Sequence, residues 1–371
     1  MSDRKKRVLV AMSGGVDSSV VALMLHNQGY EVVGITMKTW DYAASGGSSK
    51  ETGCCSLDSI NDARIIAVDM GFHHMILDIR NEFGDFVIDN FVDEYLSGRT
   101  PNPCVLCNTH IKWEALLKRA DMLDCEFIAT GHYANIAQTD DGRYYVEAGK
   151  DPKKDQSYVL WGLTQESLSR TLFPLGNYEK TEIKQMALDS GFKHLVNKSE
   201  SFEICFVPDN DYRGFLKRNV EGLTDRVAGG NFVLSDGTVV GQHEGYPFYT
   251  IGQRKGLGIA LGDPMYVTEI RSEENVVVLG PVNELDRNIM RVYKINLQKY
   301  DRIPEEGIEC LIKIRHHDVG AMGMVYQEAD NSVRVEFAAP VKGVAPGQSS
   351  VFLQDGEIIG GGIIQSGDLK K

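Results

Sequence analysis

The chain of 371 residues has no long apolar run and few cysteines. A membrane-spanning helix needs about 20 consecutive apolar residues, and no run approaches that length, so we expect no membrane association. The seven cysteines are odd in number and scattered, which argues for cytosolic thiols and against a secreted disulfide framework. The chain also enters an apolar strand pattern within a few residues of Met1, without a signal or transit sequence. These features predict a cytoplasmic protein.

Positive charge is scarce as well. The chain carries 39 Lys and Arg against 52 Asp and Glu, which gives a formal net charge of −13. This balance argues weakly against nucleic acid as a partner, because contacts to phosphates need Lys and Arg. Net charge is a sum, however, and binding depends on the local patch, so a nucleic-acid partner is not excluded.

The most informative stretch, Ser13–Ser19, is S-G-G-V-D-S-S. The apolar, β-branched run before it predicts a buried strand, and apolar residues at helical spacing after it predict a helix that ends near Gly29. The first turn of such a helix has unpaired N–H groups, and Gly14 and Gly15 let the backbone fold closely around an anion. This pattern favours binding of nucleotide phosphates over a plain glycine turn. No lysine follows the glycines, which excludes the G-x-x-x-x-G-K-[ST] loop of kinases and GTPases.

The periodicity predicts an α/β fold with a mainly parallel sheet in the first part of the chain, because strand and helix patterns alternate there. From about Tyr212 short β runs and glycine turns replace the helical patterns. After Asp286 strands dominate, with turns at regular intervals, which predicts a small closed β-barrel. We therefore expect an N-terminal parallel-sheet domain, a small mixed central domain and a C-terminal β-barrel, with limits at residues 1–211, 212–285 and 286–371.

Three cysteines are candidates for chemistry. Cys104 and Cys107 form a C-x-x-C pair directly after two prolines, where a helix is expected to begin, and a thiol at a helix N-terminus has a lowered pKa. Taken alone, the pair fits a redox pair, half a metal site or chance, and the lack of a second C-x-x-C disfavours zinc. Cys205 lies in an apolar stretch, where it is either a core residue or a reactive thiol. The adjacent Cys54 and Cys55 have no assigned role.

Five motifs follow one another along the chain, each of them weak alone. They are S-G-G-V-D-S from Ser13, G-R-T-P-N-P-C-x-x-C-N from Gly98, A-T-G-H-Y from Ala129, K-D-Q-S-Y from Lys154 and S-E-S-x-E-I-C-F from Ser199. In this order, and over nearly the whole chain, they resemble the tRNA-uridine 2-sulfurtransferases (tRNA-specific 2-thiouridylases) of the ATP pyrophosphatase, or PP-loop, superfamily. The resemblance implies a PP-loop domain like that of the adenine nucleotide α-hydrolases, followed by a central tRNA-binding domain and the barrel.

The resemblance also implies a reaction. ATP, with Mg²⁺, adenylates the C2 oxygen of the wobble uridine in tRNAs of the Lys, Glu and Gln type. A persulfide then attacks C2, and AMP and pyrophosphate are released. The matching positions are Cys107 for the nucleophile and Cys205 for the persulfide carrier, and the two can form a disulfide as sulfur is released. A persulfide donor protein is the implied partner.

The resemblance also implies which residues contact ATP and tRNA, by the position of each residue in the motifs. The positions that would bind ATP are Ala11, Met12, Ser13, Gly14, Gly15, Val16, Asp17, Ser18, Met37 and Gly131. The positions that would contact the target base or the tRNA are Asn102, Pro103, Cys104, His132, Lys154, Asp155, Gln156, Arg315, His316 and Gln348.

One position departs from the family pattern. Many members have an Asp, proposed as an acid/base, where this chain has Cys104, and a thiol only partly replaces it because its pKa is higher. The departure gives three candidate thiolates, and some related tRNA-thiolating enzymes hold a [4Fe–4S] cluster on three cysteines. A cluster on Cys104, Cys107 and Cys205 is therefore an alternative, although the persulfide route is preferred.

Two other function classes stay open at this point. An amide-forming ligase of small metabolites would use the same loop without a cysteine pair, and a non-catalytic RNA-binding module would not need an intact loop. If tRNA is the substrate, basic side chains should gather on one face of an otherwise acidic protein, which we expect to be a monomer. The expected set is Lys153, Lys154, Lys180, Lys184, Arg213, Lys217, Arg254, Lys255 and Arg315.

Overall fold

The structure is a computed structural model that describes residues 5–40, 56–198, 204–207, 209–329 and 331–368. Cys54 and Cys55 lie outside these residues. The chain divides into two compact units. The first, unit 1, contains residues 1–87, 104–210 and 356–358, and the second, unit 2, contains residues 88–103, 211–355 and 359–371. Among the described residues, no helix combines the length and the apolar character needed to cross a bilayer.

Unit 1 is built on a five-stranded sheet in the order β3-β2-β1-β4-β7, in which every pairing is parallel. The strands are β1 (Arg7–Ala11), β2 (Glu31–Lys38), β3 (His73–Asp78), β4 (Phe127–Ala129) and β7 (Thr171–Leu172). The predicted α/β class is confirmed. From β1 the chain first continues to β2 and β3 on one side and later adds β4 on the other. Ligands of such sheets bind beyond the carboxyl ends of the strands at this reversal, and the loop Ser13–Ser19 leaves β1 there.

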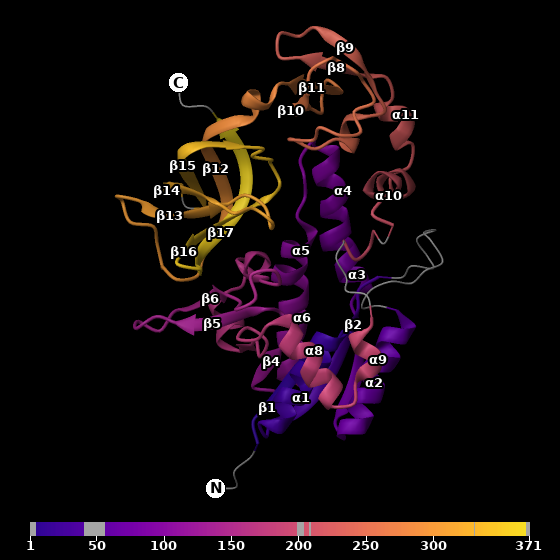
Figure 1. Cartoon of the computed structure of the whole chain (residues 1–371), viewed down its shortest axis with the longest axis vertical. Helices are drawn as coiled ribbons and strands as arrows, with labels where there is room; N and C mark the ends of the chain where they lie inside the picture. The colour runs from indigo at the N-terminus through magenta and orange to yellow at the C-terminus, as the bar shows by residue number, and fades with distance from the viewer. Residues whose placement is uncertain (1–4, 41–55, 199–203, 208, 330, 369–371) are drawn as a thin grey trace. The chain divides into compact units, whose positions relative to one another are not determined.

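Helices cover this sheet (Figure 1). The first two are α1 (Val16–Asn27) and α2 (Leu57–Met70), and Ser56 caps α2 by accepting a hydrogen bond from the Ser59 N–H. The stretch after β3 forms three helical pieces in series: α3 (Arg80–Phe83), the π-helical segment η1 (Gly84–Ile88) and, in unit 2, α4 (Asp89–Leu96). The remaining elements of unit 1 are α5 (Pro103–Leu106), η2 (Cys107–Lys112), α6 (Trp113–Met122), the hairpin β5 (Ala134–Gln138) and β6 (Tyr144–Ala148), η3 (Ser157–Leu160), α7 (Gln165–Ser169), α8 (Lys180–Asp189) and α9 (Lys193–Val196).

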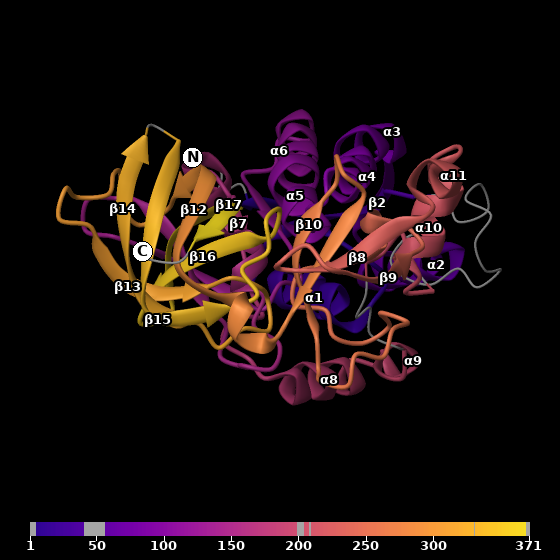
Figure 2. The ribbon, with the colours of Figure 1, turned by 90° about the horizontal axis from the view of Figure 1, so that it is seen from above.

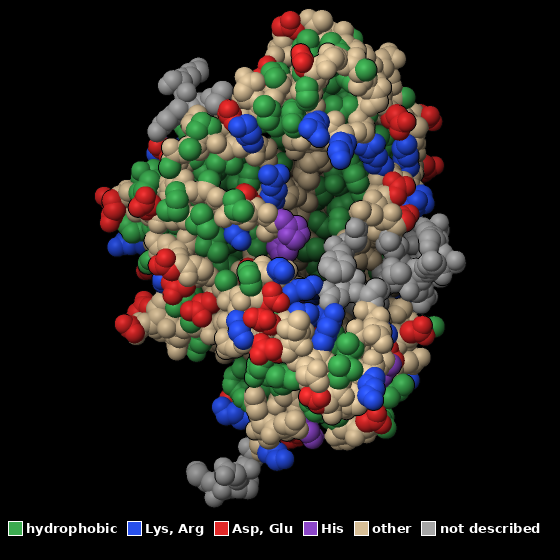
Figure 3. Space-filling view, in the orientation of Figure 1, with side chains coloured by type: hydrophobic (Ala, Val, Ile, Leu, Met, Phe, Trp, Pro, Cys, Tyr) green, Lys and Arg blue, Asp and Glu red, His purple; other side chains and the backbone are tan. Residues whose placement is uncertain are grey.

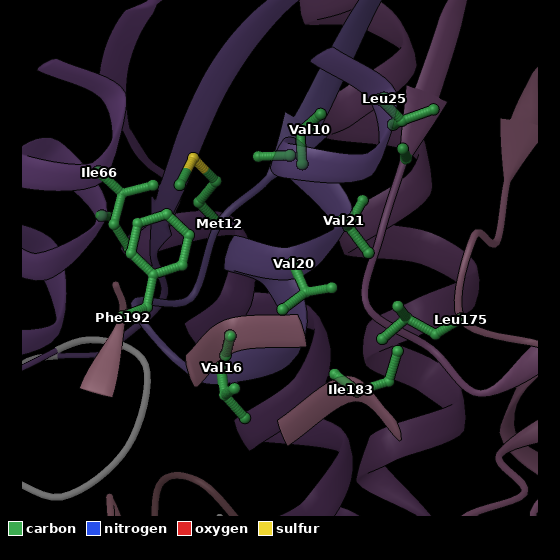
Figure 4. Packing of buried hydrophobic residues seen from close by; sticks show 14 of the residues in the cluster. Val10, Met12, Val16, Val20, Val21, Leu25, Ile66, Leu175, Ile183 and Phe192 are labelled. Atoms are coloured by element: carbon green, nitrogen blue, oxygen red, sulfur yellow. The ribbon is translucent and has the colours of Figure 1, made fainter. Parts of the chain in front are cut away.

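The core of unit 1 surrounds α1. Val10 and Met12, at the end of β1, pack with Val16 and Val20 of α1 and with Ile183 of α8 (Figure 4). All five are buried to 7% exposure or less. Burial of an apolar side chain of this size contributes about 1.5–3 kcal/mol, so the packing holds the start of α1 against both the sheet and α8. This rigid frame positions the loop between β1 and α1.

The middle part of unit 2 differs from the sequence-based expectation. Short strands were predicted from about Tyr212, but two helices come first, α10 (Tyr212–Asn219) and α11 (Leu223–Val227). Asp211 caps α10 through a hydrogen bond from the Gly214 N–H, which is a start signal that the prediction missed. A four-stranded sheet follows in the order β10-β11-β8-β9, made of β8 (Gly230–Leu234), β9 (Val239–His243), β10 (Tyr266–Arg271) and β11 (Val276–Gly280), with the 3₁₀ turns η4 (Tyr246–Phe248) and η5 (Val282–Leu285).

The last part of unit 2 is the predicted closed barrel (Figure 2). Six strands pair in the order β12-β15-β14-β13-β16-β17, and a further pairing of β12 with β17 closes the ring. They are β12 (Asp286–Leu297), β13 (Ile308–Lys313), β14 (Ala321–Ala329), β15 (Ser332–Lys342), β16 (Ser349–Gln354) and β17 (Glu357–Asp368). Residues 356–358 group with unit 1, where the Ala148 N–H donates to the Gly356 carbonyl at 2.9 Å.

Candidate functional site

The loop Ser13–Ser19 is held by its own hydroxyl groups. The Ser18 hydroxyl accepts a hydrogen bond from the Ser13 N–H at 3.0 Å and lies 3.2 Å from the Ser13 hydroxyl. The Ser19 hydroxyl donates to the Gly15 carbonyl at 2.8 Å. These bonds fix the turn before α1 begins, so that its first N–H groups are displayed at a helix N-terminus that favours anions.

At two positions neighbouring atoms come so close to the backbone that only glycine fits without a shift. Gly14 has φ +69°, and a Cβ there would lie 2.0 Å from the Ser59 carbonyl oxygen of α2. A Cβ on Gly131 would lie 3.2 Å from both the Asp17 Cβ and the Ser18 nitrogen. The structure therefore brings Gly131, which follows β4, against the loop, as expected for residues that share one nucleotide site. Met37 lies on β2, the neighbour of β1, near its carboxyl end.

The two cysteines of the C-x-x-C pair differ in exposure. Cys104 is exposed on α5, whereas Cys107, the first residue of η2, is 6% exposed. Desolvation by nearby protein atoms raises the pKa of the Cys104 thiol, and Lys112 acts in the opposite direction. The pKa of Cys104 is therefore shifted in the direction opposite to the one predicted from the helix start, because desolvation disfavours the thiolate.

Cys107 is followed by a buried polar residue. Asn108 is 2% exposed, and its amide nitrogen donates to the Val159 carbonyl at 3.1 Å. Its side-chain oxygen is buried and has no hydrogen-bond partner among the described residues. A buried acceptor without a partner is costly, so the Asn108 oxygen is a polar group that the described residues leave unsatisfied.

Cys205 is partly buried, and the following residue, Phe206, packs edge-on against Phe83 with ring centroids 5.8 Å apart. The five described cysteines form no disulfide. Within the described part of the chain, no three His, Cys, Asp or Glu side chains lie close enough to hold a metal ion. The geometry thus gives no support to a cluster on Cys104, Cys107 and Cys205.

His132 is a neutral residue in this setting. Its ring lies 5.5 Å from Trp113 and 6.0 Å from Phe173, between centroids, and its Nδ1 is 2.8 Å from the Thr130 hydroxyl. Burial, with the charge of Lys112, lowers the pKa of His132 to about 3. A neutral imidazole cannot form an ion pair with a phosphate, but it can donate a hydrogen bond to a base or ribose, or accept one from it. Sequence reasoning did not single out Lys112, whose charge acts on both His132 and Cys104.

The side chains of the K-D-Q motif are used in different ways. The Asp155 carboxylate accepts hydrogen bonds from the Gly149 N–H, the Ser157 N–H and the Ser157 hydroxyl at 2.9–3.2 Å. Gln156 accepts from the Tyr133 N–H at 3.1 Å. Both residues therefore shape their own loop and hold it against the residue after His132, while the lysine of the motif, Lys154, is partly exposed beside them.

In unit 2, Gln348 holds the proline-rich segment that precedes Cys104. Its amide nitrogen donates to the Thr100 and Pro101 carbonyls at 3.1 and 2.7 Å, and the Thr100 N–H donates to the Pro346 carbonyl at 2.8 Å. Arg99 donates to both oxygens of the buried Glu94 at 2.6 and 2.8 Å. The structure thus brings Gln348 together with the segment leading to Asn102.

Arg315 and His316 are exposed in the turn after β13, where the Asp318 N–H donates to the Arg315 carbonyl at 3.2 Å. Both side chains are accessible to a large partner such as tRNA. Within unit 2, Lys and Arg side chains also gather over the region of α10 on the face drawn in Figure 3. One member of the predicted basic set does not belong to a surface patch: Lys180 is 8% exposed and bound to Asp17.

Three family models match the chain in series. They are described as the tRNA methyl transferase HUP domain (residues 6–209), the tRNA methyl transferase PRC-barrel domain (214–281) and the aminomethyltransferase beta-barrel domain (287–364). The tRNA-specific 2-thiouridylase MnmA of Amoebophilus asiaticus is 63% identical, over 98% of this chain and 96% of its own. The chain belongs to the tRNA-specific 2-thiouridylase family. Other relatives of that name are 62% identical in Cytophaga hutchinsonii (98% of each chain) and 57% in Salinibacter ruber (97% of this chain, 94% of that one).

Proposed function

We propose that this protein places sulfur on C2 of the wobble uridine of tRNA, using ATP to activate the C2 oxygen and a cysteine persulfide to deliver the sulfur. Its family membership makes it a tRNA sulfurtransferase. The observation that supports the finer mechanism is that the anion-binding loop Ser13–Ser19 and the thiols of Cys104, Cys107 and Cys205 all belong to unit 1.

The first step is adenylation. The loop and the first turn of α1 would receive the phosphates of ATP, and the C2 oxygen of uridine would attack the α-phosphorus with release of pyrophosphate. Mg²⁺ would enter with the phosphates of ATP, because this ion usually keeps several waters and takes few protein ligands. Adenylation turns the C2 oxygen, a poor leaving group, into part of a good one, which departs as AMP.

The second step is sulfur transfer. The terminal sulfur of a persulfide on Cys205 attacks C2 and forms a carbon–sulfur bond, while AMP departs with the C2 oxygen. The Cys107 thiolate then attacks the Cys205 sulfur, which breaks the sulfur–sulfur bond, leaves sulfur on C2 and forms a Cys107–Cys205 disulfide. A thiol reductant restores the two cysteines. Lys112 adds positive charge near this chemistry, and the neutral His132 is suited to a hydrogen bond with the base.

The decisive experiment is single-turnover thiolation of a tRNA with a wobble uridine, with ATP and inorganic polysulfide as sulfur source. Nucleosides are then analysed by mass spectrometry. We expect Cys107→Ser and Cys205→Ser to abolish 2-thiouridine formation, and Cys104→Ser to keep most of it. Cys125→Ser is the matched control, because Cys125 is another buried cysteine of unit 1, at 3% exposure, outside the proposed chemistry.

Three outcomes would overturn the proposal. Retained thiolation in both Cys107→Ser and Cys205→Ser would exclude the persulfide route. ATP cleavage by the wild-type protein with amide formation on a small metabolite, and no sulfur in any tRNA, would favour a ligase. Loss of activity in all three cysteine variants, together with bound iron, would instead favour the iron–sulfur alternative.

A further inference from the structure

The carboxylate of Asp17 is enclosed by two donors that come from distant parts of the chain. Lys180 Nζ donates to both carboxylate oxygens, each at 2.7 Å, and the Tyr133 hydroxyl donates to Oδ1 at 2.7 Å. The side chains are 10% exposed for Lys180 and 31% for Asp17. The motif contains Asp17, but nothing in the family pattern used above assigns a role to Lys180 or Tyr133.

Lys180 is held in place by its own surroundings. It is the first residue of α8, whose start is stabilised by a capping box between Glu179 and Glu182. Its backbone N–H donates to the Asp151 carboxylate at 3.1 Å, and its Nζ lies 5.7 Å from the centroid of the Tyr133 ring. The backbone bonds fix the position of Lys180 at the start of α8, and its ammonium group already contacts Asp17 before any ligand arrives, so the contact is preorganised.

The position of Asp17 creates an electrostatic problem. It lies in the first turn of α1, whose N–H groups face the site proposed for the triphosphate of ATP. A bare carboxylate at this point would repel the phosphates, because like charges a few ångströms apart in a partly dry site oppose each other strongly. A Cβ added at Gly131 would lie 3.2 Å from the Asp17 Cβ, so the backbone after β4 packs closely against this residue.

We propose that Lys180 is the fixed counter-charge of Asp17: it neutralises the carboxylate so that the loop accepts the triphosphate, and it does not bind the phosphates itself. Asp17 in turn ties the loop to α8 and to Tyr133. Lys180 is thus a positioning residue that acts on ATP through Asp17. The inference rests on the proposed function, because it concerns the ATP site of that reaction.

Two other roles for the same contact make different predictions. Lys180 could leave Asp17 and contact a phosphate directly when ATP binds. Alternatively, the ion pair could serve only to tie α1 to α8. A double variant that removes both charges distinguishes these two roles from the proposed one. Removing only Lys180 leaves the Asp17 charge uncompensated, whereas removing both partners does not.

The test is an equilibrium titration with ATP of the wild type, Lys180→Met, Asp17→Asn and the double variant, with thermal unfolding of each. We expect Lys180→Met to weaken ATP binding roughly 30-fold or more, and the double variant to regain most of that loss. Lys180→Arg, which keeps the charge, should stay within a few-fold of the wild type. Lys193→Met is the control for net charge, because Lys193 is exposed on α9.

Tyr133→Phe provides a second route in case Lys180→Met does not fold. It removes one donor from Asp17, so we expect ATP binding to weaken by about threefold in the wild-type background and to stay unchanged in Asp17→Asn. A double variant as weak as Lys180→Met would overturn the inference in favour of a direct phosphate contact. Unchanged ATP binding in all variants, with only a lower unfolding temperature, would overturn it in favour of a structural tie. A wild-type protein that does not bind ATP would instead refute the proposed function itself.

Discussion

The nucleotide loop and the cysteine segment of unit 1 are built in opposite ways. In the loop, Ser13, Ser18 and Asp17 all have hydrogen-bond partners within the protein before any ligand binds. In the cysteine segment, Cys104 is exposed, the helix is interrupted by the π-helical η2, and Asn108 keeps a buried oxygen without a partner among the described residues. Phosphates are held by several fixed N–H donors at once, so a site for them gains from rigidity, whereas a thiol with the proposed role in sulfur transfer needs groups that can change partner.

The largest effect is expected from a substitution in the rigid nucleotide loop. Gly14→Ala places a Cβ 2.0 Å from the Ser59 carbonyl oxygen at a backbone φ of +69°. We expect a loss of stability of about 3 kcal/mol or more, and ATP binding reduced by a factor on the order of 100, because strain and overlap add at one residue. Chemical unfolding and ATP titration measure the two effects.

Gly71→Ala is the control for Gly14→Ala. Gly71 has a similar φ of +74° at the end of α2, but a Cβ there meets nothing within 4 Å. It should therefore show the cost of the backbone conformation alone, about 1 kcal/mol, with ATP binding intact. Equal losses in the two variants would mean that close packing against Ser59 does not matter.

A smaller effect is expected from a substitution that loosens the cysteine segment. Gln348→Ala removes the amide that holds the Thr100 and Pro101 carbonyls of the segment before Cys104. We expect the thiolation rate to fall about tenfold through misplacement of that segment, with ATP binding unchanged. Gln354→Ala, which also removes a barrel glutamine that donates to a backbone carbonyl, is the control. A drop in ATP affinity in Gln348→Ala would contradict the division between the two regions.

An effect that appears only with changing pH concerns His132, whose pKa is lowered to about 3 by burial. Because the folded form binds its proton less readily than the unfolded chain does, the neutral ring contributes stability above about pH 6.5, and this is lost as the pH falls toward 3. In this window the slope of unfolding free energy with pH should decrease by up to about 1.4 kcal/mol per pH unit in His132→Gln. Denaturant unfolding between pH 6.5 and 4.5 measures it, with the exposed His26→Gln as control. Equal slopes in the wild type and His132→Gln would mean that the ring is protonated in the folded protein.

The sequence was sufficient for features set by local patterns. The strand, loop and helix around Ser13–Ser19 were predicted because apolar periodicity and glycine placement are local properties. The closed barrel was predicted from the regular turns after Asp286, and the pairing of β12 with β17 closes it. The π-helical turn at Cys107 could not be read from a 3.6-residue period.

Features that depend on distant pairs were not predictable. Lys180 was placed with the surface lysines, because no local sequence pattern indicates that its partner is Asp17, 163 residues away. The same holds for Gln348, which was matched by motif position but not to the carbonyls that it holds. Where the α10 helix begins, a local signal did exist, since Asp211 is a good N-cap residue, and it was overlooked among glycine and asparagine turns.

The grouping of residues 356–358 with unit 1 bears on how the protein can be shortened. A chain cut after residue 211 would keep the loop and all the candidate cysteines, yet it would lose the Gly356 carbonyl that accepts from Ala148 and the Glu357 carboxylate that accepts from the Tyr145 hydroxyl at 3.1 Å. Strand β6 would then end as a bare edge, a ready template for pairing with other chains. A truncated catalytic part should therefore aggregate unless a short β segment is supplied to cover that edge.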